Sequence, residues 1–424
     1  MASIKLFITQ ILVKNDLLFP VGVWLTSRVF ILAVMLLVAP MLKAPSGGIS
    51  ATFGWEVFDA WDSIHYRAIA TTGYEYANDS KGHNLAFFPL FPLIIKGLIS
   101  LGLPFDVAGT LLNNLAFLAA VYFLYFWSKK QYGQAPARWA TLVLAWFPSA
   151  LFTSVIYTEG LYLLLSTAAI QAFDQHQYRW TAFWGAMATA TRPTGIALIP
   201  AFLIAAKVER RPPIAYITAL TTAAGILLFS LYCAVQFGDP MAFIHAQRGW
   251  RSSLGFDWQG WWKMLMQITV GTANWKHGWI KDPLHPALFC IILTIGYALW
   301  RYRQQLGSIK MTYGFAALIL FLWLLAGDPL INTVTVFGGA YLLWHLRTQL
   351  TPITVIYGFC GLGLIVISGG TWSLSRIAYG IVSLSVALSI LLSRYTRWGN
   401  LTLIFFAILM ASFAVRFAQE LWVG

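Results

Sequence analysis

The residues best suited to chemistry lie in an acidic stretch at 58–66, just after the first long apolar run. If this stretch forms a helix, Asp59 and Asp62 share one face, and their mutual repulsion favours a proton on one of them. A carboxylate in that setting can serve as a general base, with His65 or the second carboxylate orienting it. The alternative is an interfacial helix whose acids simply face water, and the residues alone do not separate the two.

A further acid, Glu159, stands two residues after Tyr157 between two short apolar runs. An acid at such a place is costly and must be paired or functional. Arg192, inside the apolar run 180–206, is a candidate partner, and a structural ion pair is as consistent with the pattern as a catalytic one. Pro193 removes a backbone donor and crowds the preceding turn, which predicts that this run is broken there.

Arginines in the Trp-rich segment 237–283 suit a phosphate group. Arg248 stands there among aromatic residues, and a guanidinium forks two hydrogen bonds onto a phosphate. Arg376, which follows Gly369 and Gly370, is another basic candidate. Anchoring to lipid head groups accounts for these arginines equally well.

Motifs for other common chemistries are missing from the sequence. There is no Gly-rich phosphate loop, no His-Glu-x-x-His, no Gly-x-Ser-x-Gly and no Cys/His cluster. We therefore expect neither a bound metal nor a cofactor. The three cysteines, Cys233, Cys290 and Cys360, lie far apart in apolar stretches and are expected to be small buried hydrophobes.

Apolar runs must position all of these residues. The 424 residues are 59% hydrophobic and 10% charged, with a mean hydropathy of +0.69, whereas soluble domains are about 45–50% apolar and about 25% charged. At about 20 residues per span, the sequence predicts an all-α polytopic membrane protein with about 11–13 transmembrane helices. We expect one integral membrane domain over 1–424. Arg28 interrupts the first run, 17–42, and must find a partner or a water-filled cavity.

Charge along the chain predicts the topology. The net charge of +13 comes largely from short turns between apolar runs, which is typical of cytoplasmic loops and anionic lipid contacts and counts against nucleic acid. From a cytoplasmic N-terminus, the two long segments 43–85 and 237–283 fall outside the membrane. We expect the second to form short interfacial helices. The same count places the basic residues of 129–138 outside and Glu159 inside.

Short motifs follow Asp62 in a recurring order. They are Trp61-Asp62-x-x-His65-Tyr66, Ile69-Ala70-x-x-Gly73-Tyr74, His83-Asn84-x-Ala86-Phe87-Phe88-Pro89-x-Phe91-Pro92, Phe147-Pro148, Tyr157-x-Glu159, Thr191-Arg192-x-x-Gly195 and Gly238-Asp239-Pro240. Together they resemble the PIG-V type of membrane mannosyltransferase, that is, the GPI mannosyltransferase II family and its prokaryotic relatives. Beyond residue 284 the resemblance fades to a loose Ser373-Leu374-Ser375-Arg376.

The resemblance implies a GT-C fold whose catalytic residues lie in the first extracytoplasmic loop, here 43–85. It also implies a polyprenyl-phosphate sugar donor, mannose as the sugar, and inversion at the anomeric carbon. The base of that family maps onto Asp62, with Asp59 and His65 beside it. The residues then expected to bind substrate are Trp61, Tyr66, His83, Asn84, Tyr157 and Glu159. Those expected on the donor phosphate are Arg192, Arg248 and Arg376.

The remaining partners are a lipid-linked or cell-envelope acceptor and the membrane lipids. We expect an integral protein of a prokaryotic cytoplasmic membrane, with its active site on the extracytoplasmic face. The rival hypothesis is a membrane transporter or lipid flippase, which would place its essential charges in mid-membrane. Arg28, Lys96 and Arg192 give that rival some support, whereas the concentration of acids in the two long segments favours the enzyme.

Overall fold

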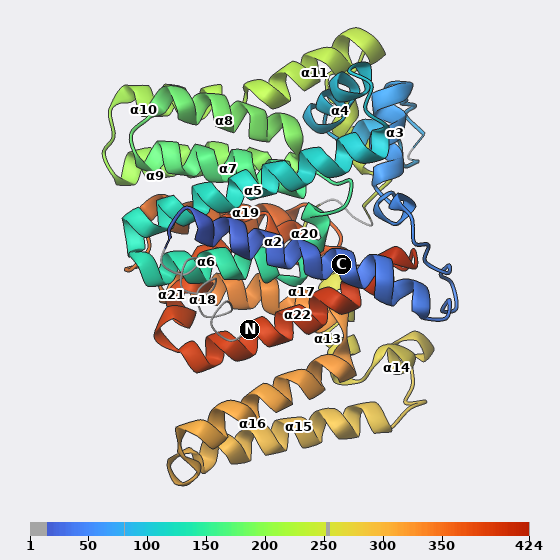
Figure 1. The fold of residues 1–424 in the computed structure, drawn as a ribbon, viewed down its shortest axis with the longest axis vertical. Coiled ribbons are helices and arrows are strands. Elements are labelled where there is room, and N and C mark those ends of the chain that lie inside the picture. Colours follow the sequence, from blue (N-terminus) through green and yellow to red (C-terminus); the bar gives the residue numbers. More distant parts are fainter. Residues whose placement is uncertain (1–14, 80, 252–254, 424) are drawn as a thin grey trace, which may run out of the picture.

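The computed structural model describes residues 15–79, 81–251 and 255–423, and within them the chain is helical without any strand (Figure 1). The longer helices are α2 (Leu18–Ala33), α4 (Leu90–Ser100), α5 (Phe105–Tyr132), α6 (Gln134–Trp146), α7 (Glu159–Asp174), α8 (Tyr178–Thr191), α9 (Leu198–Val208), α11 (Ala224–Phe237), α13 (Trp258–Thr269), α15 (Leu284–Arg301), α16 (Arg303–Ala326), α19 (Pro352–Ile367), α21 (Val382–Arg394) and α22 (Thr396–Ala418). The shorter ones are α3 (Ser63–Thr71), α10 (Pro213–Thr221), α12 (Ala242–Gln247), α14 (Thr272–His277), α17 (Asp328–Thr333), α18 (Gly339–His345) and α20 (Leu374–Tyr379).

Six helical segments are long and apolar enough to cross a membrane. They are Leu18–Met41, Phe105–Tyr132, Pro213–Phe237, Leu284–Arg301, Arg303–Ala326 and Thr396–Ala418. The predicted class, an all-α polytopic membrane protein, is confirmed. The uninterrupted spans are fewer than the 11–13 predicted, because other apolar runs form helices that are short or broken.

One such break occurs at Arg192, as the sequence predicted. Helix α8 ends at Thr191, and the backbone of Arg192 is extended, with φ −151° and ψ 150°. Pro193 then opens a 3-10 turn over Pro193–Ala197 that leads into α9. Because proline supplies no N–H and cannot continue α8, the guanidinium of Arg192 leaves the helix at the break.

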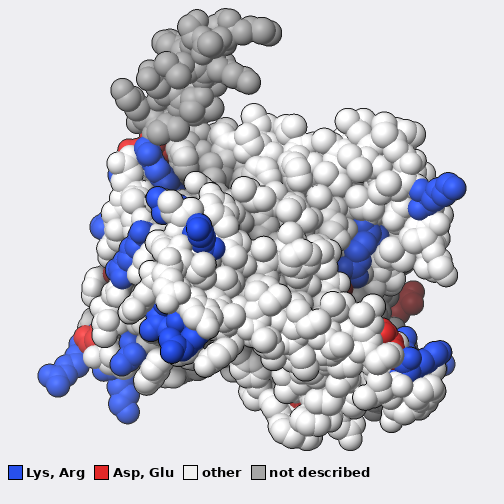
Figure 2. All heavy atoms as spheres, turned by 90° about the horizontal axis from the view of Figure 1, so that it is seen from below, with Lys and Arg blue, Asp and Glu red and all other residues white. Residues whose placement is uncertain are grey.

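The basic turns lie together at one end of the helix bundle, here called the basic end. Figure 1 shows the turns between α5 and α6, α9 and α10, and α15 and α16 on the left, with α3 and α14 on the right. In Figure 2, charged side chains gather towards two opposite sides and an uncharged band lies between them. That band suits the hydrocarbon layer of a membrane.

Ion pairs at the basic end correct the predicted topology. Lys129 Nζ lies 2.5 Å from Oδ2 of Asp16, which precedes α2. The end of α5 therefore lies beside the start of α2, not at the opposite face. Two errors had cancelled in the predicted count: the 11-residue helix α4 is about 16 Å long and too short to cross, whereas 180–206 runs out and back as α8 and α9.

Arg28 of α2 finds its partners in the segment that precedes α7. Its side chain is 4% exposed, and Nη1 donates to the hydroxyl of Thr153 at 2.8 Å and to that of Ser154. Nη2 lies 3.4 Å from the carbonyl oxygen of Ala150, and the guanidinium stands over the Phe117 ring at 4.8 Å. Hydroxyls and a carbonyl thus satisfy this cation, and in return it holds the irregular turn after α6 in place.

Asn113 of α5 fixes the start of α7. Its side-chain nitrogen donates to the carbonyl oxygens of Phe152 and Val155 at 2.8 and 2.7 Å, and its Oδ1 accepts from the N–H of Gly160 at 2.7 Å. The side chain is fully buried. One amide therefore satisfies three backbone groups of the segment that carries Tyr157 and Glu159.

Gly160→Ala should destabilise the protein by about 2 kcal/mol, because an overpacked contact must be relieved. A Cβ at Gly160 would lie 2.3 Å from the carbonyl oxygen of Asn113 and 2.4 Å from its Oδ1. The measurement is thermal unfolding in detergent. Gly363→Ala in α19 is the control, since a Cβ there meets nothing within 4 Å. Equal melting temperatures for the two variants would contradict the close packing of α5 against α7.

The hairpin of α15 and α16 stands apart from the other helices at the bottom of Figure 1. No residue of α15 is buried, and Cys290 on it is exposed. The prediction that all three cysteines are buried is therefore wrong for Cys290, although Cys233 is buried and Cys360 is partly covered. The helix is apolar on all sides, which is typical of a lipid-facing span.

Candidate active site

The chain around Asp62 is not one continuous helix, contrary to the sequence prediction. A 3-10 turn ends at Phe58 and α3 begins at Ser63. Between them Trp61 adopts a left-handed φ of 59°, a strained conformation for a bulky residue that costs about 1–3 kcal/mol. Because of this break, Asp59 and Asp62 do not share a helix face.

Asp62 is held by two side chains from distant parts of the sequence. Its Oδ2 accepts a hydrogen bond from Nη1 of Arg376 at 2.9 Å, and its backbone N–H donates to the hydroxyl of Tyr157 at 3.2 Å. The carboxylate is 22% exposed. Within the described part of the chain, no hydrogen bond is made to Oδ1, so this oxygen is available to a ligand.

Arg376 joins Asp62 to a buried ion pair. Glu159, which is 1% exposed, lies with Oε1 at 2.5 Å from Nη1 of Arg192 and 3.6 Å from Nε of Arg376. The predicted pairing of Glu159 with Arg192 is thus confirmed. The guanidinium of Arg376 also stands 5.3 Å from the centre of the Tyr157 ring. Asp62, Glu159, Arg192 and Arg376 are called the ion cluster below.

The ion cluster gathers four distant segments at the end opposite the basic turns. Glu159 opens α7, Arg192 lies in the break after α8, and Arg376 follows Ser373, whose φ is 55°. The placement of Glu159 on the inner side, away from the long segments, is therefore wrong. Its cause is the miscounted helix α4.

Asp59 belongs to a separate cluster. Its carboxylate pairs with Arg67 of α3, which also pairs with Asp106 of α5 and stands over the Phe105 ring at 4.3 Å. Burial lowers the pKa of Arg67, and the two carboxylates raise it by more. Asp59 is thus committed to fixing α3 against α5.

His65 is oriented by aromatic packing. Its ring stacks on Phe87 at 4.7 Å and meets the edge of Trp250 at 4.9 Å. Burial lowers the pKa of His65, and the charge of Asp62 offsets only part of that effect. The imidazole is therefore neutral at pH 7. Its ring nitrogens make no hydrogen bond within the ranges that the structure describes.

His83 and Asn84 hold the first long segment together. His83 Nε2 lies 2.6 Å from Oδ1 of Asp79, and the amide of Asn84 accepts from the Glu75 N–H at 2.8 Å and donates to the Gly73 carbonyl at 3.2 Å. These contacts close the loop 73–84. The structure gives both residues this role and no contact with Asp62.

The remaining predicted site residues lie around the ion cluster at different distances. Tyr66 is buried among the Phe87 and Phe91 rings, whereas Trp61 is 37% exposed and meets the edge of Trp422 at 5.4 Å. Arg248 follows α12, and no ion pair joins it to any residue among those described. It is therefore not brought into the ion cluster.

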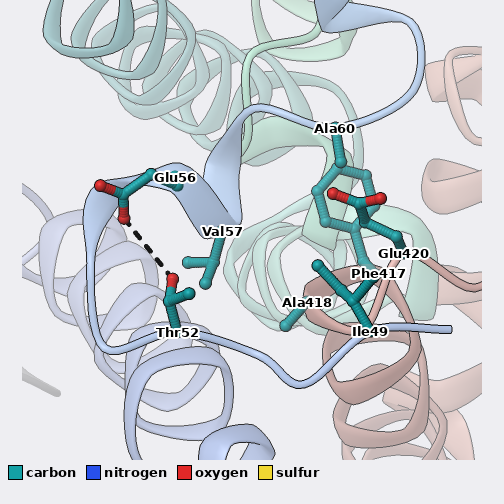
Figure 3. Close-up of a pocket in the computed structure, with 8 residues that line it drawn as sticks. All are labelled: Ile49, Thr52, Glu56, Val57, Ala60, Phe417, Ala418 and Glu420. Atoms are coloured by element: carbon teal, nitrogen blue, oxygen red, sulfur yellow. Dashed lines mark hydrogen bonds between the residues drawn. The ribbon is translucent and has the colours of Figure 1, made fainter. Parts of the chain in front are cut away.

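A hollow beside the acidic stretch extends the site (Figure 3). Phe417 forms part of its wall and also contacts the Tyr157 ring, with centres 5.9 Å apart. Its lining is mostly apolar with two carboxylates, from Ile49, Thr52, Glu56, Val57, Ala60, Phe417, Ala418 and Glu420. In the described residues, no group of three His, Cys, Asp or Glu side chains is arranged to hold a metal ion.

Sequence comparisons identify relatives with one described activity. A family model described as mannosyltransferase (PIG-V) matches residues 21–235, just over half of the chain. GPI alpha-1,6-mannosyltransferase 2 of Homo sapiens is 22% identical over 298 residues, covering 60% of this chain and 59% of that protein. The protein of the same name from Cricetulus griseus is 25% identical over 259 residues, with 52% and 51% covered. The chain thus spans between half and three fifths of these relatives.

Solved structures share the general helical architecture. ArnT from Cupriavidus metallidurans bound to undecaprenyl phosphate is 12% identical, with 91% of this chain and 62% of that chain covered and a TM-score of 0.49. The apo oligosaccharyltransferase of Archaeoglobus fulgidus is 11% identical, with 96% and 56% covered and a TM-score of 0.48. Asp62, Glu159 and Arg192 lie inside the family match, whereas Arg376 lies beyond it.

Proposed function

Because the chain belongs to the PIG-V mannosyltransferase family, we propose that it is a membrane glycosyltransferase. It transfers a mannosyl group from a polyprenyl-phosphate donor to a hydroxyl of a lipid-linked or cell-envelope acceptor, with inversion at C1, within the GT-C fold that the resemblance implies. The observation that supports this most strongly is the ion cluster, in which a carboxylate with a free oxygen lies beside buried guanidiniums.

Asp62 is the general base of this reaction. As the acceptor oxygen forms its bond to C1, Asp62 takes the hydroxyl proton, while the bond from C1 to the phosphate oxygen breaks and its electron pair leaves with the phosphate. The transition state is oxocarbenium-like, as in glycosidases. Arg192 and Arg376 stabilise the charge that develops on the leaving phosphate.

Arg376 couples donor binding to the base. Without a donor it is shared between Asp62 and Glu159. A donor phosphate brings further negative charge and competes for the guanidinium, which loosens its hold on Oδ2 of Asp62. A carboxylate released in this way is a stronger base than one in an ion pair, so the base becomes active when the donor has bound.

The site belongs on the extracytoplasmic face of a prokaryotic cytoplasmic membrane. The basic turns lie at the end opposite the ion cluster, and basic turns favour the cytoplasm. The transporter or flippase alternative loses its main support, because Arg28 and Arg192 have protein partners and Lys96 is exposed on the short helix α4.

The test is a transfer assay with purified protein in proteoliposomes. Polyprenyl-phosphate mannose labelled in the sugar is supplied with a lipid extract as acceptor, and labelled product is resolved by chromatography. We expect labelled lipid with the anomeric configuration inverted relative to the donor. No transfer from any polyprenyl-phosphate sugar, with mannose, glucose and N-acetylglucosamine each tried, would overturn the proposed function.

A further inference from the structure

Arg251 reaches the ion cluster from the second long segment, 237–283. Its Nη1 donates to the carbonyl oxygen of Gly369 at 2.9 Å, seven residues before Arg376. Burial, and after it the charges of Arg376 and Arg192, lower the pKa of Arg251. Three guanidiniums from distant parts of the sequence therefore act on one another at this site.

The charges around the site do not balance. Arg192, Arg251 and Arg376 carry three positive charges, and the carboxylates that pair with them, Asp62 and Glu159, carry two. Arg251 has a backbone carbonyl as its partner, and no carboxylate among the described residues pairs with it. The Nε of Arg376 is buried without a hydrogen bond. A partly buried excess of positive charge is costly unless an anion is bound.

Fixed contacts hold Arg251 in this place. The neighbouring Trp250 donates from Nε1 to the carbonyl oxygen of His83 at 3.1 Å and packs its ring against His65. Gly249 passes so close to Lys81 that a Cβ would lie 2.2 Å from the Lys81 carbonyl carbon. The segment 249–251 is thus fixed between the first long segment and the backbone that leads to Arg376.

We propose that Arg251 is a further donor-binding residue, whose guanidinium forms with Arg192 and Arg376 a three-arginine site for the phosphate of the polyprenyl donor. The same site holds the polyprenyl phosphate product after transfer. This inference rests on the proposed function. It assigns to Arg251 the role that the sequence suggested for Arg248, and it makes the second long segment part of the donor site.

The test compares Arg251→Met and Arg251→Lys with wild type in the transfer assay. We expect Arg251→Met to raise the donor KM and the inhibition constant of added polyprenyl phosphate by about tenfold or more, as for a lost charge-assisted hydrogen bond. The acceptor KM should stay near its wild-type value. Arg251→Lys should fall between the two, since an ammonium keeps the charge without the fork.

Lys263→Met is the matched control, because it removes one positive charge from an exposed position on α13 in the same segment. Polyprenyl phosphate alone should raise the melting temperature of wild type and of this control but not of Arg251→Met. If Arg251→Met does not fold, the donor KM of Arg251→Lys decides. The proposal is overturned if wild type transfers while both Arg251 variants keep its donor KM and product inhibition. Failure of wild type to transfer counts against the proposed function instead.

Discussion

Asp62→Asn is expected to lower the transfer rate by about 10²- to 10⁴-fold at saturating donor and acceptor, the range for loss of a general base. Asparagine keeps the shape of the side chain and can still accept from Arg376 Nη1, so the ion cluster should stay assembled. It cannot take the acceptor proton. The donor KM should therefore change little, and the loss should appear in kcat.

Asp59→Asn is the matched control for this experiment, since it neutralises a carboxylate three residues away. Asp59 pairs with Arg67, which Asp106 also holds, so the variant should lose some stability and keep most of its kcat. A rate near that of wild type for Asp62→Asn would remove Asp62 as the base. If Asp59→Asn lost as much rate as Asp62→Asn with an unchanged melting temperature, the base would have to be reassigned to Asp59.

Local chemistry accounts for the parts of the fold that the sequence predicted correctly. Composition alone predicted an all-α membrane protein, and the break at Arg192 followed from Pro193. The topology was harder, because a helix of 11 residues and a span are both apolar and differ mainly in length. Basic turns could not reveal the error, since Lys207 falls on the same side in both counts.

The site was predictable where one residue is costly in its own surroundings. Glu159 and Arg192 stood out as charges in apolar runs, and their pairing follows from that cost. The contact between Asp62 and Arg376 joins residues 314 apart, so only tertiary packing brings them together. Asn113 gave a weaker signal, a polar residue on an otherwise apolar helix, and its three backbone partners could not be inferred.

Glu159→Gln should have the largest effect on stability, because it removes the buried charge that lies between Arg192 and Arg376. Breaking a buried pair by removing one partner costs about 3–5 kcal/mol, since the other charge stays buried without compensation. Here two guanidiniums would remain with Asp62 as their single carboxylate. We expect a clear fall in melting temperature and loss of transfer, because Arg376 would then bind Asp62 more tightly.

The double variant Glu159→Gln/Arg192→Met separates a structural role of the pair from a functional one. It removes both charges, so much of the stability lost in Glu159→Gln should return. If the pair only held α7 against the break after α8, transfer would return with stability. If Arg192 binds the donor phosphate, the double variant should melt near wild type and still show a donor KM raised by about tenfold or more. Recovery of both the melting temperature and the donor KM would exclude Arg192 from the donor site.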